Sequence, residues 1–393
     1  MSATTEKPAG HSSTFLTPIT IPPWKRRGLA ALRGAEFFAA LYTFLLSVAL
    51  IGAGFKLFGK PFAEALITST ANPFVGLFVG VLATSLVQSS SCTTSMVVGM
   101  VAGGALEVHN AIPMIMGANI GTTVTNTLVS LGHVTRKDEF KRALPGALVH
   151  DFFNLLAVAV LLPLEIATGY LERTAGFLSE ALWGTQSVKF HSPVKAIIKP
   201  ASKFIMHTLD GWFDATPAGV TAIILGLGLL FGSLYFMTRI MRTALAGRVE
   251  GLLDKTIGRA PILGLILGAI LTSIVQSSSV VTSILVPLAA AGILTVEQIF
   301  PITLGANIGT TVTAILASFA VGPVGLTIAL AHLLFNITGI VLVYPLPAIR
   351  AVPIRLARWL GELAAESKRY AIMYVVGVFF AVPGLLILIS RFL

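Results

Sequence analysis

Two segments of the chain each occur twice. Gln88–Ser91 returns as Gln276–Ser279, and Gly117–Thr125 returns unchanged as Gly305–Thr313. Both pairs stand at the same offset, and no gap is needed between them when the chain is compared with itself. Chance does not keep such a register, so the sequence predicts two homologous halves built around the same pair of motifs.

Long apolar stretches place both halves in a membrane. Of the 393 residues, 55% are hydrophobic and only 11% are charged, with a mean hydropathy of +0.87. Residues 216–238 and 321–349 hold no fixed charge, and each reaches the roughly 20 residues that a helix needs to cross a bilayer core. The expected fold class is therefore an all-α polytopic membrane protein in a lipid bilayer.

The net charge of +10 fits the same interpretation. The basic residues gather in short clusters between apolar runs, at 25–33, 136–142, 239–259 and 350–369. The positive-inside rule explains such clusters without a nucleic-acid partner, and it places them and the N-terminus in the cytoplasm. Cys92 is the only cysteine, so the chain can form no internal disulfide.

Three crossings in the first half would leave the second half upside down. We expect these crossings at 34–55, 111–131 and 143–165, which gives two inverted-topology repeats, as in many secondary transporters. The predicted division is a cytoplasmic N-terminal segment at 1–33, repeat 1 at 34–165, an external loop with an interfacial helix at 166–215, repeat 2 at 216–346, and a basic cytoplasmic loop with a C-terminal helix at 347–393.

Each repeat is expected to contain a re-entrant helical hairpin, at 73–106 and at 261–294. The apolar run before each Gln-Ser-Ser-Ser tetrapeptide holds about 15 residues, which is too short to cross a bilayer core. Irregular backbone at membrane depth is tolerated where it is buried in protein or lines a wet cavity. The backbone N–H groups that begin the returning half-helix, with the serine hydroxyls, can bind an oxyanion there, and sodium can supply the missing positive charge.

The Gly-Ala-Asn-Ile-Gly-Thr-Thr segments at 117–123 and 305–311 are expected to interrupt their helices. Two glycines inside an apolar run favour unwinding, and freed carbonyls with Asn and Thr oxygens are the hard ligands that an alkali cation prefers. Each repeat is thus predicted to contain a discontinuous helix that binds sodium. Gly80 and Gly268 are instead expected to serve close helix packing.

Asp151 is a carboxylate at membrane depth, and such groups are costly and usually functional. His150 and His332 recur in both repeats, and a packing role is favoured over ligation for them. Asn154 and Asn336 are expected to bridge helices.

These motifs resemble the type II sodium-phosphate cotransporter family over residues 34–346. The residues that carry the resemblance are the duplicated tetrapeptides, the duplicated Asn segments and Val-His-Asp-Phe-Phe-Asn at 149–154. The resemblance implies sodium-driven symport of inorganic phosphate by alternating access, with the two tips meeting at the substrate site and sodium as co-substrate without any cofactor. Electrogenic members carry Ala-x-Ala-x-x-x-Asp, so Asp151 implies electrogenic transport of divalent phosphate, although Pro145 replaces the first Ala.

The candidate site residues follow from the motifs and the resemblance together. The phosphate-binding set is Gln88, Ser89, Ser90, Ser91, Gln276, Ser277, Ser278, Ser279, Thr122 and Thr310. The sodium-binding set is Gln88, Ser91, Thr94, Ser95, Asn119, Thr122, Thr123, Asp151, Gln276, Ser279, Thr282, Ser283, Asn307, Thr310 and Thr311.

Other functions use the same motifs. A sodium-dependent transporter of another small anion and a passive anion channel both keep the polar tips. An intramembrane hydrolase with His150 or His332 as base needs a single activated serine, which the duplication of the tips argues against, so we expect no enzyme. A second copy of the chain in a homodimer is a further candidate partner. Since residues 166–215 hold neither Cys nor Asn, unlike the glycosylated loop of animal relatives, we expect a bacterial inner-membrane protein.

Overall fold

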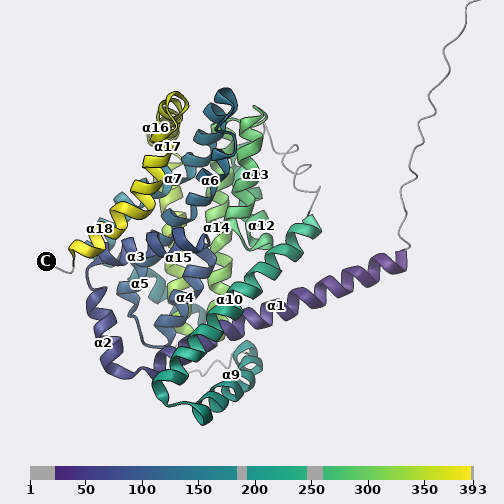
Figure 1. Cartoon of the computed structure of the whole chain (residues 1–393), viewed down its shortest axis with the longest axis vertical. Helices are drawn as coiled ribbons and strands as arrows, with labels where there is room; N and C mark the ends of the chain where they lie inside the picture. The colour runs from purple at the N-terminus through teal and green to yellow at the C-terminus, as the bar shows by residue number, and fades with distance from the viewer. Residues whose placement is uncertain (1–22, 184–192, 246–259, 391–393) are drawn as a thin grey trace, which may run out of the picture.

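The computed structural model describes residues 23–183, 193–245 and 260–390, and every regular element in those ranges is helical (Figure 1). The helices up to the middle of the chain are α1 (Pro23–Leu57), α2 (Gly59–Ser69), α3 (Pro73–Val87), α4 (Ser90–Ala102), α5 (Val108–Thr122), α6 (Val124–Leu131), α7 (Lys137–Thr168), α8 (Tyr170–Trp183) and α9 (Pro193–Trp212). Those that follow are α10 (Ala215–Leu245), α12 (Pro261–Val275), α13 (Ser278–Ala290), α14 (Val296–Val321), α15 (Pro323–Val343), α16 (Pro347–Glu366), α17 (Arg369–Val376), a π-helical turn η1 (Gly377–Ala381) and α18 (Val382–Ile389).

Six membrane-spanning candidates lie in the described residues. They are Ala31–Leu57, Lys137–Thr168, Ala215–Ala244, Val296–Val321, Pro323–Val343 and Arg369–Ile389, and the bent pair α2 and α3, with an angle of 97°, is a seventh candidate. The expectation of an all-α polytopic membrane protein is thereby confirmed. Two predicted segments lie partly outside the described residues. These parts are residues 1–22 of the N-terminal segment 1–33 and residues 246–259 of the basic cluster at 239–259.

Glycines at equivalent positions bring helices together in the two repeats. A Cβ on Gly80 of α3 would overlap the backbone carbonyl of Met114 in α5, and a Cβ on Gly268 of α12 would overlap that of Ile302 in α14. The paired helices therefore pack backbone against backbone, as expected for small residues in membrane helices. The duplication in sequence is matched by a duplicated packing unit.

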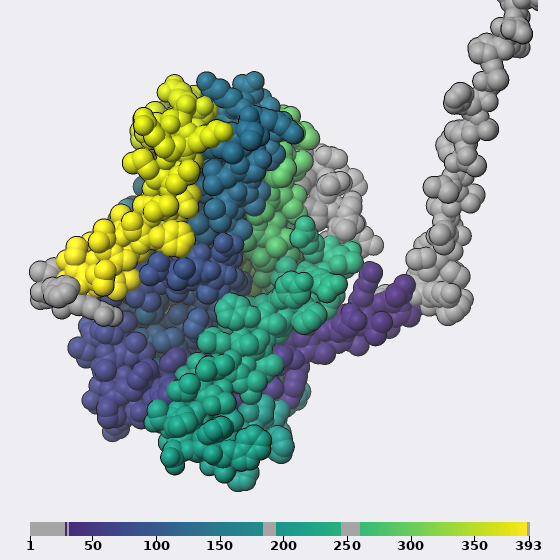
Figure 2. Space-filling view, viewed as in Figure 1, coloured from purple at the N-terminus to yellow at the C-terminus, as the bar shows by residue number. Residues whose placement is uncertain are grey.

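The first helix of each repeat also pairs with its counterpart. A Cβ on Gly54 of α1 would lie 2.8 Å from the carbonyl oxygen of Gly219, and one on Gly219 of α10 would lie 2.9 Å from that of Gly54. Figure 2 shows α10, in teal, lying across α1, in purple. These two helices join the repeats at one side of the molecule.

The predicted unwinding of the Asn segments is wrong. Residues 117–122 are helical within α5, and residues 305–311 lie inside the uninterrupted α14. The glycines face a neighbouring helix instead: a Cβ on Gly121 would lie 2.6 Å from the carbonyl of Val81, and one on Gly309 2.5 Å from that of Ala269. Close packing on the glycine face keeps these segments helical. The predicted discontinuous helix exists in repeat 1 alone, where Thr123 separates α5 from α6.

The segments outside the two predicted hairpins differ in part from the prediction. Helix α9 lies in the predicted external loop, with Ile198 buried and Phe204 73% exposed, while residues 184–192 of this loop lie outside the described residues. The short α2 was not predicted, and the expected basic loop after residue 346 is the helix α16. The C-terminal segment, yellow in Figure 2, runs along one side of the molecule, where α18 contacts α3.

Candidate functional site

Each Gln-Ser-Ser-Ser tetrapeptide forms a sharp break between two short helices. Gln88 ends α3 with φ 56° and ψ 28°, and Gln276 ends α12 with φ 59° and ψ 25°. They are the two non-glycine residues with positive φ in the described part of the chain. Such a left-handed backbone is uncommon for a residue with a Cβ. Its recurrence at matched positions marks both breaks as functional candidates.

The following serine caps the returning helix in both tips. The Ser89 hydroxyl accepts a hydrogen bond from the backbone N–H of Cys92 at 3.2 Å, and that of Ser277 accepts one from Val280 at 3.4 Å. Both serines have extended backbone, as an N-cap residue requires. The positive ends of α4 and α13 therefore begin inside the protein, at the two tips.

The two tips meet across the repeats. The hydroxyl oxygen of Ser91, in the first turn of α4, lies 3.4 Å from the backbone carbonyl oxygen of Gln276 and 3.4 Å from the hydroxyl oxygen of Thr313 in α14. Thr313 in turn donates a hydrogen bond to the side-chain carbonyl oxygen of Gln276 at 2.9 Å. A small polar cluster thus joins repeat 1 to repeat 2 where both helices break. Thr313 was not among the predicted site residues, although it ends the duplicated Asn segment.

The tips differ in exposure. Gln88 is exposed and Gln276 is buried, at 4% exposure. Among the serines, Ser90, Ser91 and Ser278 are buried, whereas Ser89, Ser277 and Ser279 are partly exposed. The side-chain amide of Gln276 also donates to the carbonyl of Ser273 in its own helix. The two halves therefore stand in different local environments despite their equal backbone geometry.

The histidines pair with asparagines of the opposite repeat. The Nε2 of His150 lies 2.6 Å from the side-chain oxygen of Asn307, and the Nε2 of His332 lies 3.4 Å from that of Asn119. All four residues are buried. The Nδ1 atoms of both rings have no hydrogen-bond partner among the described residues. Besides the favoured packing role, each histidine therefore makes a polar contact with the opposite repeat.

Asn154 bridges helices as predicted, and Asn336 does not. The Asn154 amide donates to the backbone carbonyl of Asn119 at 2.9 Å, and its side-chain oxygen accepts from Asn307 at 2.8 Å. Asn336 instead donates to the carbonyl of His332 at 3.1 Å within its own helix. Its side-chain oxygen has no hydrogen-bond partner among the described residues, and its amide bonds to the α15 backbone.

The predicted sodium ligands after the tips have unequal surroundings. Thr282 and Ser283 of α13 donate to the side-chain oxygen of Asn126 in α6, at 2.9 and 3.3 Å. Their counterpart Thr94 is buried, and its hydroxyl has no partner among the described residues. Ser95 donates to the carbonyl of its own helix at 2.7 Å. Buried polar groups generally have a partner. The unpartnered hydroxyl of Thr94 is therefore available to bind an ion or a water.

Three threonines of the Asn segments donate within their own helices. The acceptors are the carbonyls of Ala118 for Thr122, Ala306 for Thr310 and Ile308 for Thr311, at 2.6 to 3.0 Å. The fourth, Thr123, lies 2.8 Å from the Ile120 carbonyl, but a carboxylate is the stronger acceptor for its single hydroxyl hydrogen, and Asp151 lies within reach. A hydroxyl that donates in this way keeps oxygen lone pairs with which it can bind a cation.

Asp151 has no exposed surface, and both of its carboxylate oxygens accept hydrogen bonds. Thr123, at the break between α5 and α6, donates to Oδ1 at 2.9 Å, and Tyr374 of α17 donates to Oδ2. No ion pair to Asp151 is found in the described ranges. Sequence reasoning found Asp151 and Thr123 and missed Tyr374, which lies outside both repeats.

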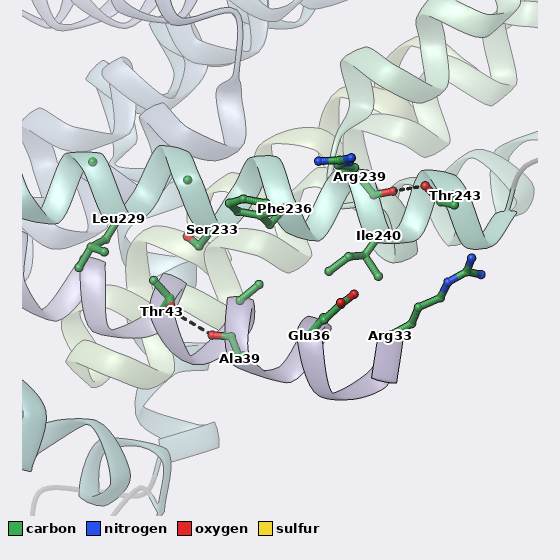
Figure 3. Close-up of a pocket in the computed structure, with 13 residues that line it drawn as sticks. Arg33, Glu36, Ala39, Thr43, Leu229, Ser233, Phe236, Arg239, Ile240 and Thr243 are labelled. Carbon is green, nitrogen blue, oxygen red and sulfur yellow. Dashed lines mark hydrogen bonds between the residues drawn. The ribbon is translucent and has the colours of Figure 1, made fainter. Parts of the chain in front are cut away.

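A groove elsewhere in the structure is lined by none of the predicted site residues. It has a volume of about 720 Å³ and lies between α1 and α10 (Figure 3). Its hydroxyls are occupied within their own helices, since Thr43 donates to the carbonyl of Ala39 and Thr243 to that of Arg239. No residue of either tip lines the groove. The polar cluster between the tips is therefore the better candidate for the functional site.

Comparison with known proteins places these features in a family. A model of the Na+/Pi-cotransporter family matches residues 43–174 and 229–343. The chain is 37% identical to the sodium-dependent phosphate transport protein 2A of Rattus norvegicus over 89% of this chain and 66% of that protein. It is 36% identical to the sodium-dependent phosphate transport protein 2B of Homo sapiens over 87% of this chain and 63% of that protein. The chain thus spans just under two thirds of the length of these relatives, and no solved structure matches it.

Proposed function

The chain belongs to the Na+/Pi-cotransporter family, and from this premise we propose that it couples sodium influx to the uptake of inorganic phosphate as a secondary symporter. The relatives at 36 to 37% identity carry sodium-dependent phosphate transport in their names. The observation that carries the proposal for this chain is the contact between Ser91 and Gln276, which joins the two tips. A transporter, and not an enzyme, is the function that these findings support.

Phosphate is proposed to bind where the tips meet. The starts of α4 and α13 offer backbone N–H groups and positive dipole ends, and the tip serines offer hydroxyls, which together suit an oxyanion. Within the described residues, Ser91, Gln276 and Thr313 form a neutral cluster. A neutral site suits transport, because an ion held by fixed cations leaves slowly.

Sodium is proposed to complete this neutral site. The unpartnered hydroxyl of Thr94 and the donating hydroxyls of Thr122 and Thr310 keep oxygens available for a hard cation. Asp151, which is buried and forms no ion pair within the described ranges, is proposed as the ligand of a further sodium, which makes transport of divalent phosphate electrogenic. Ligands that favour the same closed state are thermodynamically coupled.

The repeats are proposed to be inverted and to work by alternating access. The exchange of partners, His150 with Asn307 and His332 with Asn119, is what a two-fold relation between the repeats predicts. The unequal exposure of Gln88 and Gln276 supports a state in which one tip is open and the other closed. The domain division, the re-entrant hairpins, the cytoplasmic N-terminus, the bacterial inner membrane and a homodimer remain predictions from the sequence.

Uptake of radiolabelled phosphate into proteoliposomes tests the proposed function. An inward sodium gradient should drive accumulation, and replacing sodium by choline should abolish it. A passive anion channel, the alternative that keeps the same cavity, would give equal phosphate flux in both salts and no accumulation. Competition by other oxyanions in the same assay identifies a transporter of a different small anion.

A further inference from the structure

The C-terminal helix reaches the carboxylate that the proposed function assigns to sodium. The segment from α17 to α18, Arg369–Ile389, lies outside both repeats and beyond the family match, which ends at residue 343. Most of its surface faces outward, and the side chains of Ile372, Met373 and Val376 are each at least half exposed. Tyr374 is turned the other way, and its hydroxyl donates to Oδ2 of Asp151.

Aromatic packing fixes the ring of Tyr374. Its centroid lies 5.7 Å from that of Phe152, the residue after Asp151, and 6.1 Å from that of Phe379 in an edge-to-face arrangement. Phe379 has no exposed surface and belongs to the π-helical turn η1. Such turns re-aim side chains and are frequent at functional sites. The hydroxyl is therefore held in place by two rings on different helices.

The carboxylate of Asp151 is held between two helices by two donors. Thr123 donates to one oxygen from the helix break, and Tyr374 donates to the other from α17. A fully buried carboxylate needs such donors when no protein cation pairs with it. Both donors leave the carboxylate a net negative charge, so a cation remains the group that can neutralise it.

We propose that Tyr374 is a positioning residue for sodium at Asp151, which makes the C-terminal helix part of the cation site. The proposal rests on the proposed function, since it takes Asp151 as a sodium ligand. The Tyr374 hydroxyl fixes the direction of the carboxylate and stabilises it in the ionised form that sodium requires. Without this hydroxyl the carboxylate loses one of its two donors and its fixed orientation, and sodium binding becomes weaker.

The test compares Tyr374→Phe with Tyr370→Phe. Tyr370 lies one turn earlier on α17, is also partly buried, and has the Arg369 guanidinium over its ring in place of a contact with Asp151. Sodium binding is read from the thermal stabilisation of the purified full chain by sodium chloride against choline chloride. Tyr374→Phe should raise the half-saturating sodium concentration about tenfold, the loss expected for a hydrogen bond to a charged group. Tyr370→Phe should match the wild type.

Two further variants separate positioning from general structural damage. Replacement of Tyr374 by 4-aminophenylalanine keeps a donor at the same place on the ring and should restore sodium binding. In an Asp151→Asn background, Tyr374→Phe should cause no further change in the sodium dependence, because the group that it positions has lost its charge. In uptake assays at saturating sodium, the half-saturating phosphate concentration of Tyr374→Phe should stay within about twofold of the wild type, since the tips are intact.

Unchanged sodium binding in Tyr374→Phe, or an equal loss in the Asp151→Asn background, would overturn the proposal. If Tyr374→Phe proves too unstable to purify, the 4-aminophenylalanine variant decides alone: weak sodium binding despite the retained donor contradicts the proposal. A wild type that sodium stabilises but that transports no phosphate would contradict the proposed function and leave this test valid. A wild type that sodium does not stabilise at all would contradict both.

Discussion

At the scale of residues, each tip combines a glutamine in a strained backbone conformation with three serine hydroxyls. Gln88 and Gln276 adopt a left-handed backbone that glycine would adopt at lower cost. The Gln276 side chain accepts the hydrogen bond from Thr313, which glycine could not do. The polar tetrapeptide inside an apolar run was enough to predict both breaks from the sequence.

Ser91→Ala tests the tip directly. The substitution removes one hydroxyl from the contact between the repeats and little volume, so kcat/KM for phosphate should fall about tenfold while the stability changes by about 1 kcal/mol or less. The control is Ser69→Ala, because Ser69 is exposed on α2 and donates to its own helix. Phosphate uptake kinetics and a thermal melt decide the outcome. Equal kinetics in the two variants would remove Ser91 from the site.

Two polar partners could not be found from the sequence. Tyr374 lies in an apolar helix without a counterpart in a repeat, so no pattern linked it to Asp151. Asn126 lies just beyond the duplicated Asn segment, and the matching position in repeat 2 is Ala314. Comparison of the halves therefore gives no signal at Asn126, although it accepts hydrogen bonds from Thr282 and Ser283.

At the scale of elements, the spacing of polar breaks predicted the helix lengths well, whereas the glycine content of the Asn segments predicted their conformation wrongly. The short helices before and after each tip begin and end close to the predicted hairpin bounds, because their lengths followed from the spacing of polar breaks. The Asn segments were predicted to unwind from their glycines, and they remain helical. The glycines are there for contact with a neighbouring backbone, which a single sequence cannot distinguish from a helix break.

Gly268→Ala tests this packing role. The new methyl group would overlap the backbone carbonyl of Ile302, so α12 and α14 must separate, and overpacking of this kind costs about 1–3 kcal/mol. Gly232→Ala is the control, because a Cβ there meets nothing within 4 Å and alanine is the better helix former. A thermal melt of the purified variants measures both. A melting temperature for Gly268→Ala equal to that of the control would show that the helices do not pack so closely.

At the scale of the whole molecule, the repeats are joined by polar contacts from both sides. Ser91 reaches Gln276 and Thr313, and each of the two His–Asn contacts joins one repeat to the other. The resemblance to the family implied that the tips would meet. It did not show which tip would be buried, because equal sequences stand here in unequal surroundings.

A disulfide between positions 91 and 313 tests the contact between the repeats. The two hydroxyl oxygens lie 3.4 Å apart, so cysteine sulfurs at these two positions would face each other across a short gap. The variant Ser91→Cys with Thr313→Cys, in a Cys92→Ala background, should form this bond on oxidation and block any transport that requires the tips to part. Mass spectrometry of the cross-linked peptides and recovery of uptake on reduction are the measurements. Absence of the cross-link in folded protein would place the two segments apart.

The central claim is that a neutral pair of tips holds phosphate only while sodium supplies the positive charge. Equilibrium binding of radiolabelled phosphate to the purified chain, in sodium chloride and in choline chloride at equal ionic strength, measures this without transport. The account predicts that phosphate binds about 100-fold more weakly in choline, near the upper end of typical coupling between two ligands. Equal phosphate affinity in the two salts would contradict it.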